Sequence, residues 1–319
     1  MLAYTLKRLA YIAVILVVMS MLIFWATQVM PGDVAQMILG QFATEDQIGA
    51  VRARLHLDDP IHAQYLRWAS GLLRGDLGVS MMMDRPIGPL IGEAILRSAV
   101  LAGISIVFVA VIGIWLGVYS AVRRGSKTDR AISIASYFFI SVPEFFWAIV
   151  VILMVAGTLG WFPATGYAAL SEGFWTWLRH IILPVATLVS GLVAHVSRLT
   201  RSSMIETMQS QYVTAARAKG LPENVVIRRH ALRNALVPTI TVLAIDVGLL
   251  MGGIVVVETV FSYPGLGRML IFAIEQKDIP VVQAGILSVT AVYALANLAA
   301  DLLYAFFNPR IRYGNALAR

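Results

Sequence analysis

Six apolar stretches constrain this chain most, because each approaches or exceeds the ~20 residues that a helix needs to cross the hydrocarbon core of a membrane. They run at about 9–30, 96–121, 132–159, 180–199, 236–257 and 281–307. Hydrophobic residues make up 59% of the chain and charged residues only 13%, against roughly 25% charge in soluble domains. This pattern predicts an all-α integral membrane protein with six transmembrane helices, organised as one domain over residues 1–319.

Two of the stretches need comment. The first follows Lys7 and Arg8 as a signal peptide would, but it is too long and has no A-x-A cleavage site, so we expect an uncleaved anchor. The fourth contains Pro184 and His195, which predicts a kinked helix or one that faces other helices rather than lipid.

The distribution of basic residues gives the orientation. With the N-terminus inside, sixteen of the 25 lysines and arginines fall on the inner side, and most of the others lie in one long loop, where the positive-inside rule is weak. This predicts that both termini and the basic stretch 212–238 are cytoplasmic. The net charge of +7 therefore indicates membrane lipid rather than nucleic acid as a partner.

The long external loop, about 31–95, contains two helix signals. Thr44 with Gln47 fits a capping box for a short helix through Leu55. Asp59 and Pro60 open a second helix, in which four apolar residues share one face. These four are Ile61, Tyr65, Trp68 and Leu72. The two helices either cap the outer mouth of the bundle or lie on the lipid surface.

The chain lacks the residues that most enzyme classes require. It has no P-loop, no H-E-x-x-H, no G-x-S-x-G and no cysteine, and its five histidines are scattered. We therefore predict no catalytic residue, no metal site and no cofactor in this chain.

Ionisable residues within the spans are costly and are candidates for function. Glu144, next to Pro143, and Asp246 lie near mid-depth of the third and fifth spans. They either face a polar pathway and meet a cationic group on a cargo, or they hydrogen-bond within the bundle. His195 is more typical of a packed polar residue than of a ligand. Asp301 is expected to form a structural salt bridge with a basic residue such as Arg310.

An aromatic segment rich in turn residues follows the fifth span. Glu258 ends the span and is a further candidate for the pathway, and the breakers after it end the helix. The segment is interpreted as an outer gate, with an ordinary structured loop as the alternative. The gate residues would be Phe261, Tyr263, Pro264 and Gly265.

The stretch 212–238 predicts a helix, a glycine bend and a second helix. Three alanines favour a helix over 212–219, and Gly220 stands where a C-terminal glycine would. Pro222 suits the first position of the next helix, and Glu223 suits the positive end of its dipole. Such an elbow can insert into a groove on another protein.

Several motifs carry a family resemblance. Residues 215–221 (AARAKGL), residues 230–235 (HALRNA) and Pro238 resemble the cytoplasmic EAA-type loop of ABC importer permeases, and more narrowly the dipeptide/oligopeptide/nickel permease family. Thr214 stands where the general pattern has glutamate, and Pro238 lies further from Gly220 than usual. The likeness extends to residues 31–33 (PGD), 75–78 (GDLG), 258–267 and 301–310.

The resemblance implies a type I importer in a bacterial cytoplasmic membrane. It implies a second homologous permease subunit, two ABC ATPase subunits that bind ATP and Mg, and an extracytoplasmic solute-binding protein. Residues 200–235 would be the coupling loop, in which Arg217 and Lys219 pair with acids on the ATPase or with lipid phosphate. The expected ATPase contacts are Ala215, Ala216, Arg217, Ala218, Lys219, Gly220, Leu221, Pro222 and Glu223.

The most economical function is that of a pore-forming subunit that imports di- and oligopeptides by alternating access. Relatives also move nickel chelates, glutathione and opine-like compounds, and the acids in the spans do not choose among these cargoes. Two other classes stay open at this point. One is a dimeric secondary transporter with Glu144 and Asp246 as proton relays, and the other is a structural scaffold.

Overall fold

The computed structural model describes residues 2–29, 44–55 and 58–307, and within them it is helical apart from loops and one isolated β-bridge between Val79 and Pro86. In this part of the chain, five helices are long and apolar enough to cross a membrane, or six if one bent pair is counted as a span. The prediction of an all-α membrane protein is thus confirmed, while the motif at 31–33 and Arg310 lie outside the described residues. The helices are α1 (Leu2–Val29), α3 (Glu45–Leu55), α4 (Ile61–Leu73), α5 (Ile87–Val122), α6 (Lys127–Ser141), α7 (Glu144–Val151), α8 (Phe174–Met208), α9 (Gln211–Ala218), α10 (Glu223–Val225), α11 (Leu232–Val260), α12 (Leu266–Glu275) and α13 (Ile279–Phe307).

The third predicted span is broken. Helix α6 begins after Ser126, whose hydroxyl accepts a hydrogen bond from the Asp129 amide at 3.2 Å, and it ends at Ser141. Pro143 disfavours a helical conformation for the residue before it, and α7 starts at Glu144 at 104° to α6. The predicted span 132–159 is therefore formed by a bent pair of helices rather than by one straight helix.

Helix α8 covers the fourth span and continues well beyond it on both sides. It runs through Pro184 without a break. In the most apolar 18-residue segment of α8, 67% of the residues are buried, a larger share than in the corresponding segments of the other candidate spans. The prediction that this span faces other helices rather than lipid is confirmed.

The chain forms two compact units. Unit 2 comprises residues 2–97 and 265–295. The two helices predicted in its long loop agree with the sequence. At the start of α3, the Thr44 hydroxyl accepts a hydrogen bond from the Gln47 backbone amide at 3.4 Å, and the Gln47 side chain accepts one from the Thr44 amide at 3.0 Å. On α4, the Tyr65 and Trp68 rings pack against Phe24 of α1, with centroids 5.5 and 5.6 Å away. This face of α4 therefore packs on protein.

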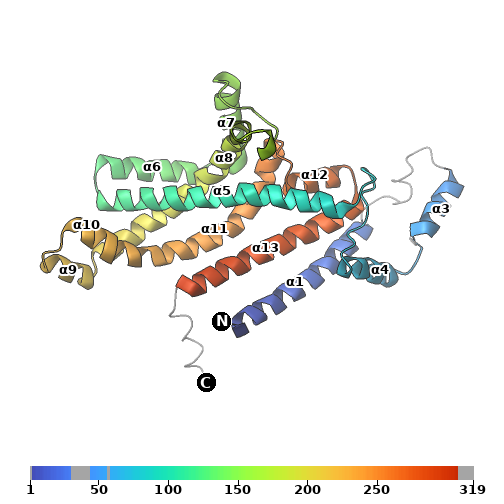
Figure 1. Cartoon of the computed structure of the whole chain (residues 1–319), viewed down its shortest axis with the longest axis horizontal. Coiled ribbons are helices and arrows are strands. Elements are labelled where there is room, and N and C mark those ends of the chain that lie inside the picture. The colour runs from blue at the N-terminus through green and yellow to red at the C-terminus, as the bar shows by residue number, and fades with distance from the viewer. Residues whose placement is uncertain (1, 30–43, 56–57, 308–319) are drawn as a thin grey trace. The chain divides into compact units, whose positions relative to one another are not determined.

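Among the described residues, unit 1 comprises 98–264 and 296–307, and it contains the candidate site. Figure 1 shows α5, α6, α8 and α11 as its long helices, with α9 and α10 at one end. Helices α5 and α8 approach closely where α5 has glycines: a Cβ at Gly113 would lie 2.8 Å from Val196, and one at Gly117 would lie 2.6 Å from the Ser197 carbonyl. The apolar core of the unit is built mainly from α5, α7, α8 and α11.

Candidate functional site

The stretch between α8 and α11 forms the predicted elbow. Helix α9 ends at Ala218, and Gly220 follows with φ +76°, a left-handed conformation that glycine adopts without strain. The sequence predicts Pro222 as the first residue of the next helix, but Pro222 is the residue before α10, which begins at Glu223. The bend therefore lies at Gly220, as its position suggests.

One side of α9 is packed onto its own unit. Val213 and Ala216 are buried in a cluster with Ala121 of α5, Met204 of α8 and Val226. Outside this cluster, the Tyr212 hydroxyl accepts a hydrogen bond from the Asn234 amide at 2.9 Å. The elbow is thereby attached to α5, α8 and the start of α11.

The other side of the elbow is exposed. Of the nine residues predicted to contact an ATPase, eight are exposed and form a short surface around the bend. Ala216 is the exception, with 5% of its surface accessible. Its side chain packs in the apolar cluster of this chain, so the surface around the bend is formed by the other eight residues.

The basic residues of the elbow differ in their partners. Arg217 forms a two-point ion pair with Glu223 across the bend, with N–O distances of 2.7 and 3.1 Å, and also donates to the Met208 carbonyl at 3.3 Å. The hydrogen bond to Glu223 raises the pKa of Arg217. The chain itself therefore supplies one acid for Arg217, whereas the exposed Lys219 forms no ion pair within the described residues.

A wide π-helical turn, Val226–Ala231, joins the elbow to α11. Such turns carry i→i+5 hydrogen bonds and occur often at functional sites. The buried residues Val226 and Ala231 are five positions apart, and Ala235 follows four positions later. This spacing is the signal in the sequence that could have predicted the turn.

Asp246, a predicted pathway residue, is completely buried on α11. Its Oδ1 lies 2.9 Å from Nδ1 of His195 on α8, while its Oδ2 has no hydrogen-bond partner within the described residues. His195 thus pairs with the acid, a role that the scattered histidines of the sequence did not reveal. An acid with one oxygen unpaired is costly to bury.

Glu144, the second predicted pathway residue, lies against α11 rather than in open space. A Cβ added at Gly253 would lie 2.1 Å from its Oε2. The glycine therefore provides the space that the carboxylate occupies at the start of α7. Glu144 thus contacts α11 at Gly253, whereas Asp246 is a residue of α11 itself, seven positions earlier in the sequence.

The segment predicted as an outer gate is packed. Glu258 is buried and accepts a hydrogen bond from the Ser98 hydroxyl of α5. Phe261 and Tyr263 are each 1% exposed, and the Tyr263 ring meets Tyr167 edge-on at 5.3 Å between centroids. The aromatic side chains of this segment thus belong to the apolar core of unit 1.

One buried polar cluster was missed in the sequence. Asp129 of α6 is buried and receives two hydrogen bonds from Arg201 of α8, at 2.6 and 2.9 Å. It also accepts from the Ser120 hydroxyl at 2.5 Å and from the Gly125 amide at 2.8 Å. The carboxylate therefore joins the ends of α5, α6 and α8 near the elbow. Asp129 and Arg201 are 72 positions apart, so no local sequence pattern predicts that they pair.

The polar groups of unit 1 are dispersed rather than gathered in one centre. Within residues 2–29, 44–55 and 58–307, no three metal-binding side chains gather in one place. The polar side chains of unit 1 instead connect one helix to another: Asp129 to Arg201, Asp246 to His195, and Glu258 to Ser98.

Comparison with known proteins identifies the family. Residues 113–313 match the family "Binding-protein-dependent transport system inner membrane component", and residues 1–104 match its N-terminal component. The chain is 35% identical to a probable peptide ABC transporter permease protein of Sinorhizobium fredii, covering 97% of this chain and 99% of the relative. It is 36% identical to a putative peptide transport system permease protein of Brucella abortus, covering 98% of this chain and all of the relative.

Two further similarities concern cargo and fold. A glutathione transport system permease protein of Salmonella paratyphi A is 37% identical over 98% of this chain and all of its own length. The MetNI methionine ABC transporter, in an inward-facing conformation, superposes with a TM-score of 0.55 at 19% identity, covering 69% of this chain and 96% of that one. This second likeness supports the fold alone.

Family, fold and the absence of known catalytic motifs agree with one another. Permeases of binding-protein-dependent importers work with ATPase and binding-protein subunits, which supply the chemistry and the capture of cargo. The chain belongs to the binding-protein-dependent transport system inner membrane component family, and it is the multi-pass, non-catalytic permease subunit of a bacterial ABC importer.

Proposed function

We propose that this permease imports di- and oligopeptides across the cytoplasmic membrane by alternating access. The observation that carries the proposal is its similarity, over nearly its whole length, to relatives named for peptide transport. Glutathione, named for another relative, is itself a small peptide. A second homologous permease would complete the pathway, two ATPases would bind ATP and Mg, and an extracytoplasmic binding protein would deliver the cargo.

The exposed surface of the elbow is the proposed docking site for an ATPase. It presents Ala215, Ala218, Lys219, Leu221 and Pro222 around the bend, which are small or apolar apart from one lysine. A short helix with such a surface suits insertion into a groove. The buried side of α9, attached to α5, α8 and α11, would carry the movement of the ATPase into the bundle.

The elbow, the N-terminus and the C-terminus are proposed to be cytoplasmic, as the distribution of lysine and arginine predicts. The cargo pathway is proposed to pass Glu144, Asp246 and Glu258 when the helices separate. In the packed arrangement each of the three lies against another helix. Phe261, Tyr263, Pro264 and Gly265 would then act as an outer gate only if this segment leaves its packed position during transport.

A transport assay tests the cargo. The chain is reconstituted in liposomes with its partner permease, ATPases and binding protein, and uptake of a labelled dipeptide and of glutathione is measured with and without ATP. Peptide import predicts ATP-dependent uptake of the dipeptide. Uptake of glutathione alone would contradict a general peptide specificity. Uptake that follows a proton gradient without ATP would contradict the importer mechanism.

Cross-linking tests the docking site. The chain has no cysteine, so Lys219→Cys gives a unique attachment point for a maleimide that carries a photoreactive group. Lys127→Cys, at the exposed first residue of α6, is the matched control on the same predicted side. We expect cross-links to the ATPase from position 219 and far fewer from position 127. Equal yields at both positions would show that the elbow is not the docking site.

A further inference from the structure

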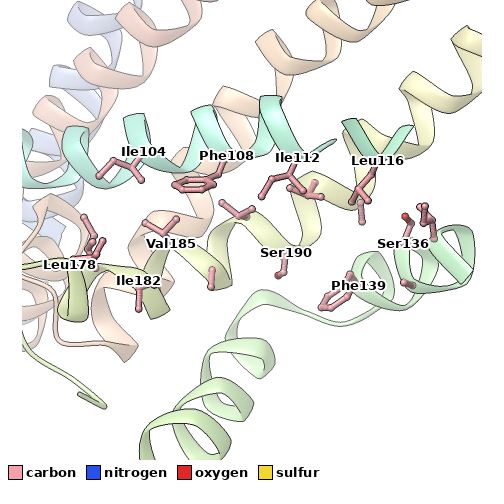
Figure 2. Close-up of a pocket in the computed structure, with 17 residues that line it drawn as sticks. Ile104, Phe108, Ile112, Leu116, Ser136, Phe139, Leu178, Ile182, Val185 and Ser190 are labelled. Atoms are coloured by element: carbon pink, nitrogen blue, oxygen red, sulfur yellow. The ribbon is translucent and has the colours of Figure 1, made fainter. Parts of the chain in front are cut away.

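An apolar groove in unit 1 has no role in the function described so far. It lies between α5 and α6, with α8 as its floor, and has a volume of about 550 Å³ (Figure 2). Of the 17 residues that line it, only Ser136 and Ser190 are polar, and the Ser190 hydroxyl donates to the Thr187 carbonyl of its own helix at 2.8 Å. The groove therefore makes almost no demand for hydrogen bonds.

The packing of the three helices explains why the groove is open. Helix α5 lies closely on α8 at Gly113 and Gly117. Helix α6 packs on α8 and is joined to it by the Asp129–Arg201 pair. At Pro143 the chain turns by 104°, so α7 does not continue the wall that α6 forms. The side chains of Phe108, Ala135 and Ala186 are consequently exposed, although they line the groove.

The dimensions of the groove suit one acyl chain. From Ile104 to Leu116 along α5 is about 18 Å at ~1.5 Å per residue, compared with roughly 15 Å for the hydrocarbon of one leaflet. Its walls are aliphatic and aromatic, and the helices that carry them lie in predicted membrane spans. Lipid hydrocarbon is thus the chemically matched occupant of the open side.

Two arginines beyond one end of the groove supply the complementary charge. Arg123 of α5 lies 3.9 Å from the centre of the Tyr119 ring, and Arg198 of α8 lies 5.9 Å from that of Tyr137. Both are exposed, and neither forms an ion pair with a described residue. Arg201 differs, because Asp129 already neutralises it. This end of the groove therefore attracts an anion.

The positions along the helices fit a single ligand. On α5, Tyr119 and Arg123 continue the face that carries Ile112 and Leu116 towards the predicted cytoplasmic end. On α8, Arg198 follows one turn after Ala194, which lines the groove. Anionic lipids concentrate in the cytoplasmic leaflet. We propose that the groove binds one acyl chain of an anionic phospholipid, whose phosphate is held by Arg123 and Arg198; the proposal assumes the inside orientation given above.

Photolabelling tests the occupant. The full chain, assembled with its partner subunits in nanodiscs, is exposed to phosphatidylglycerol with a diazirine on one acyl chain, and labelled peptides are mapped by mass spectrometry. We expect labels to concentrate at Phe108, Ile112 and Phe139 relative to Val14, an exposed residue of α1. Phosphatidylcholine with the same chains should label the groove less. Equal labelling by the two lipids would overturn the proposal.

Variants separate the two parts of the ligand. Ala186→Phe fills the groove and should abolish its enrichment in label, while Ala13→Phe, on exposed α1, should leave it unchanged. Arg123→Gln and Arg198→Gln should each weaken phosphatidylglycerol labelling about fivefold, the equivalent of ~1 kcal/mol per cation. Arg130→Gln, an exposed arginine on α6, should have no such effect.

A last measurement distinguishes a lipid from a protein occupant. Benzoylphenylalanine at position 108 should cross-link to lipid in the assembled transporter. Cross-linking to the partner permease instead would overturn the proposal and identify the groove as a protein interface. Neither outcome depends on which peptide the importer carries, so a failure here is distinguishable from a failure of the proposed function.

Discussion

Replacing Arg201 by methionine tests how the helices near the elbow are held together. The change removes both hydrogen bonds to Asp129, at 2.6 and 2.9 Å, and leaves a carboxylate whose side chain is 4% exposed. Removing one partner of a buried ion pair costs about 3–5 kcal/mol. Arg201 is itself 30% exposed, and Ser120 and Gly125 still donate to the acid. We therefore expect a loss of about 2–3 kcal/mol in the free energy of unfolding.

The assay is a denaturant titration of the purified chain in detergent micelles, followed by circular dichroism. Arg130→Met, an exposed arginine on α6, is the control and should change stability by no more than about 0.5 kcal/mol. The double variant Asp129→Asn/Arg201→Met removes the unpaired charge and should be less destabilised than the sum of the two single variants. If Arg201→Met costs no more than Arg130→Met, or if the single effects simply add, the pair does not hold these helices.

Two further substitutions test other contacts. Gly253→Ala places a methyl group 2.1 Å from the Glu144 carboxylate and should cost about 1–3 kcal/mol as overpacking; adding Glu144→Ala should restore stability in the same titration, and no restoration would show that another contact is responsible. Gly220→Ala forces a side chain to adopt φ +76° at the bend, which should cost about 1–2 kcal/mol locally. Gly220 is exposed and an added Cβ would meet nothing within 4 Å, so we expect little change in the fraction of the chain that folds. The altered bend should instead weaken the stimulation of ATP hydrolysis by peptide. Unchanged stimulation would contradict the role of the bend.

Much of the fold could be predicted because a membrane-spanning helix requires one continuous apolar segment, which is visible in the local sequence. Apolar length alone located the spans, and the Thr44 and Gln47 pair correctly predicted the start of α3. Pro143 was noted in the sequence, but its effect on the third span depended on what surrounds it. Helix α8 continues through Pro184, whereas Pro143 stands at the 104° bend between α6 and α7. Neighbouring helices, which local sequence does not reveal, decide between these outcomes.

The candidate site was predictable where a bend or a charge is visible locally, and not where partners lie far apart. Gly220 and the exposed residues around it follow from the sequence, whereas the burial of Ala216 depends on contacts with Ala121 and Met204. The pairing of Asp246 with His195 joins residues 51 positions apart. On sequence grounds alone, Glu144 and Asp246 could each have faced water or another helix, since the spans are apolar on most sides.

The wide turn from Val226 to Ala231 sets the angular phase between the elbow and the helix that follows it. One residue more or fewer in a helix rotates everything beyond it by about 100°. The π-helical turn holds one residue more than an α-helical turn. This extra residue allows Val226 to face the core beneath the elbow while Asp246 and Gly253, further along α11, still contact α8 and α7. Shortening this turn by a residue would keep every side chain of the elbow and misdirect all of them relative to the bundle.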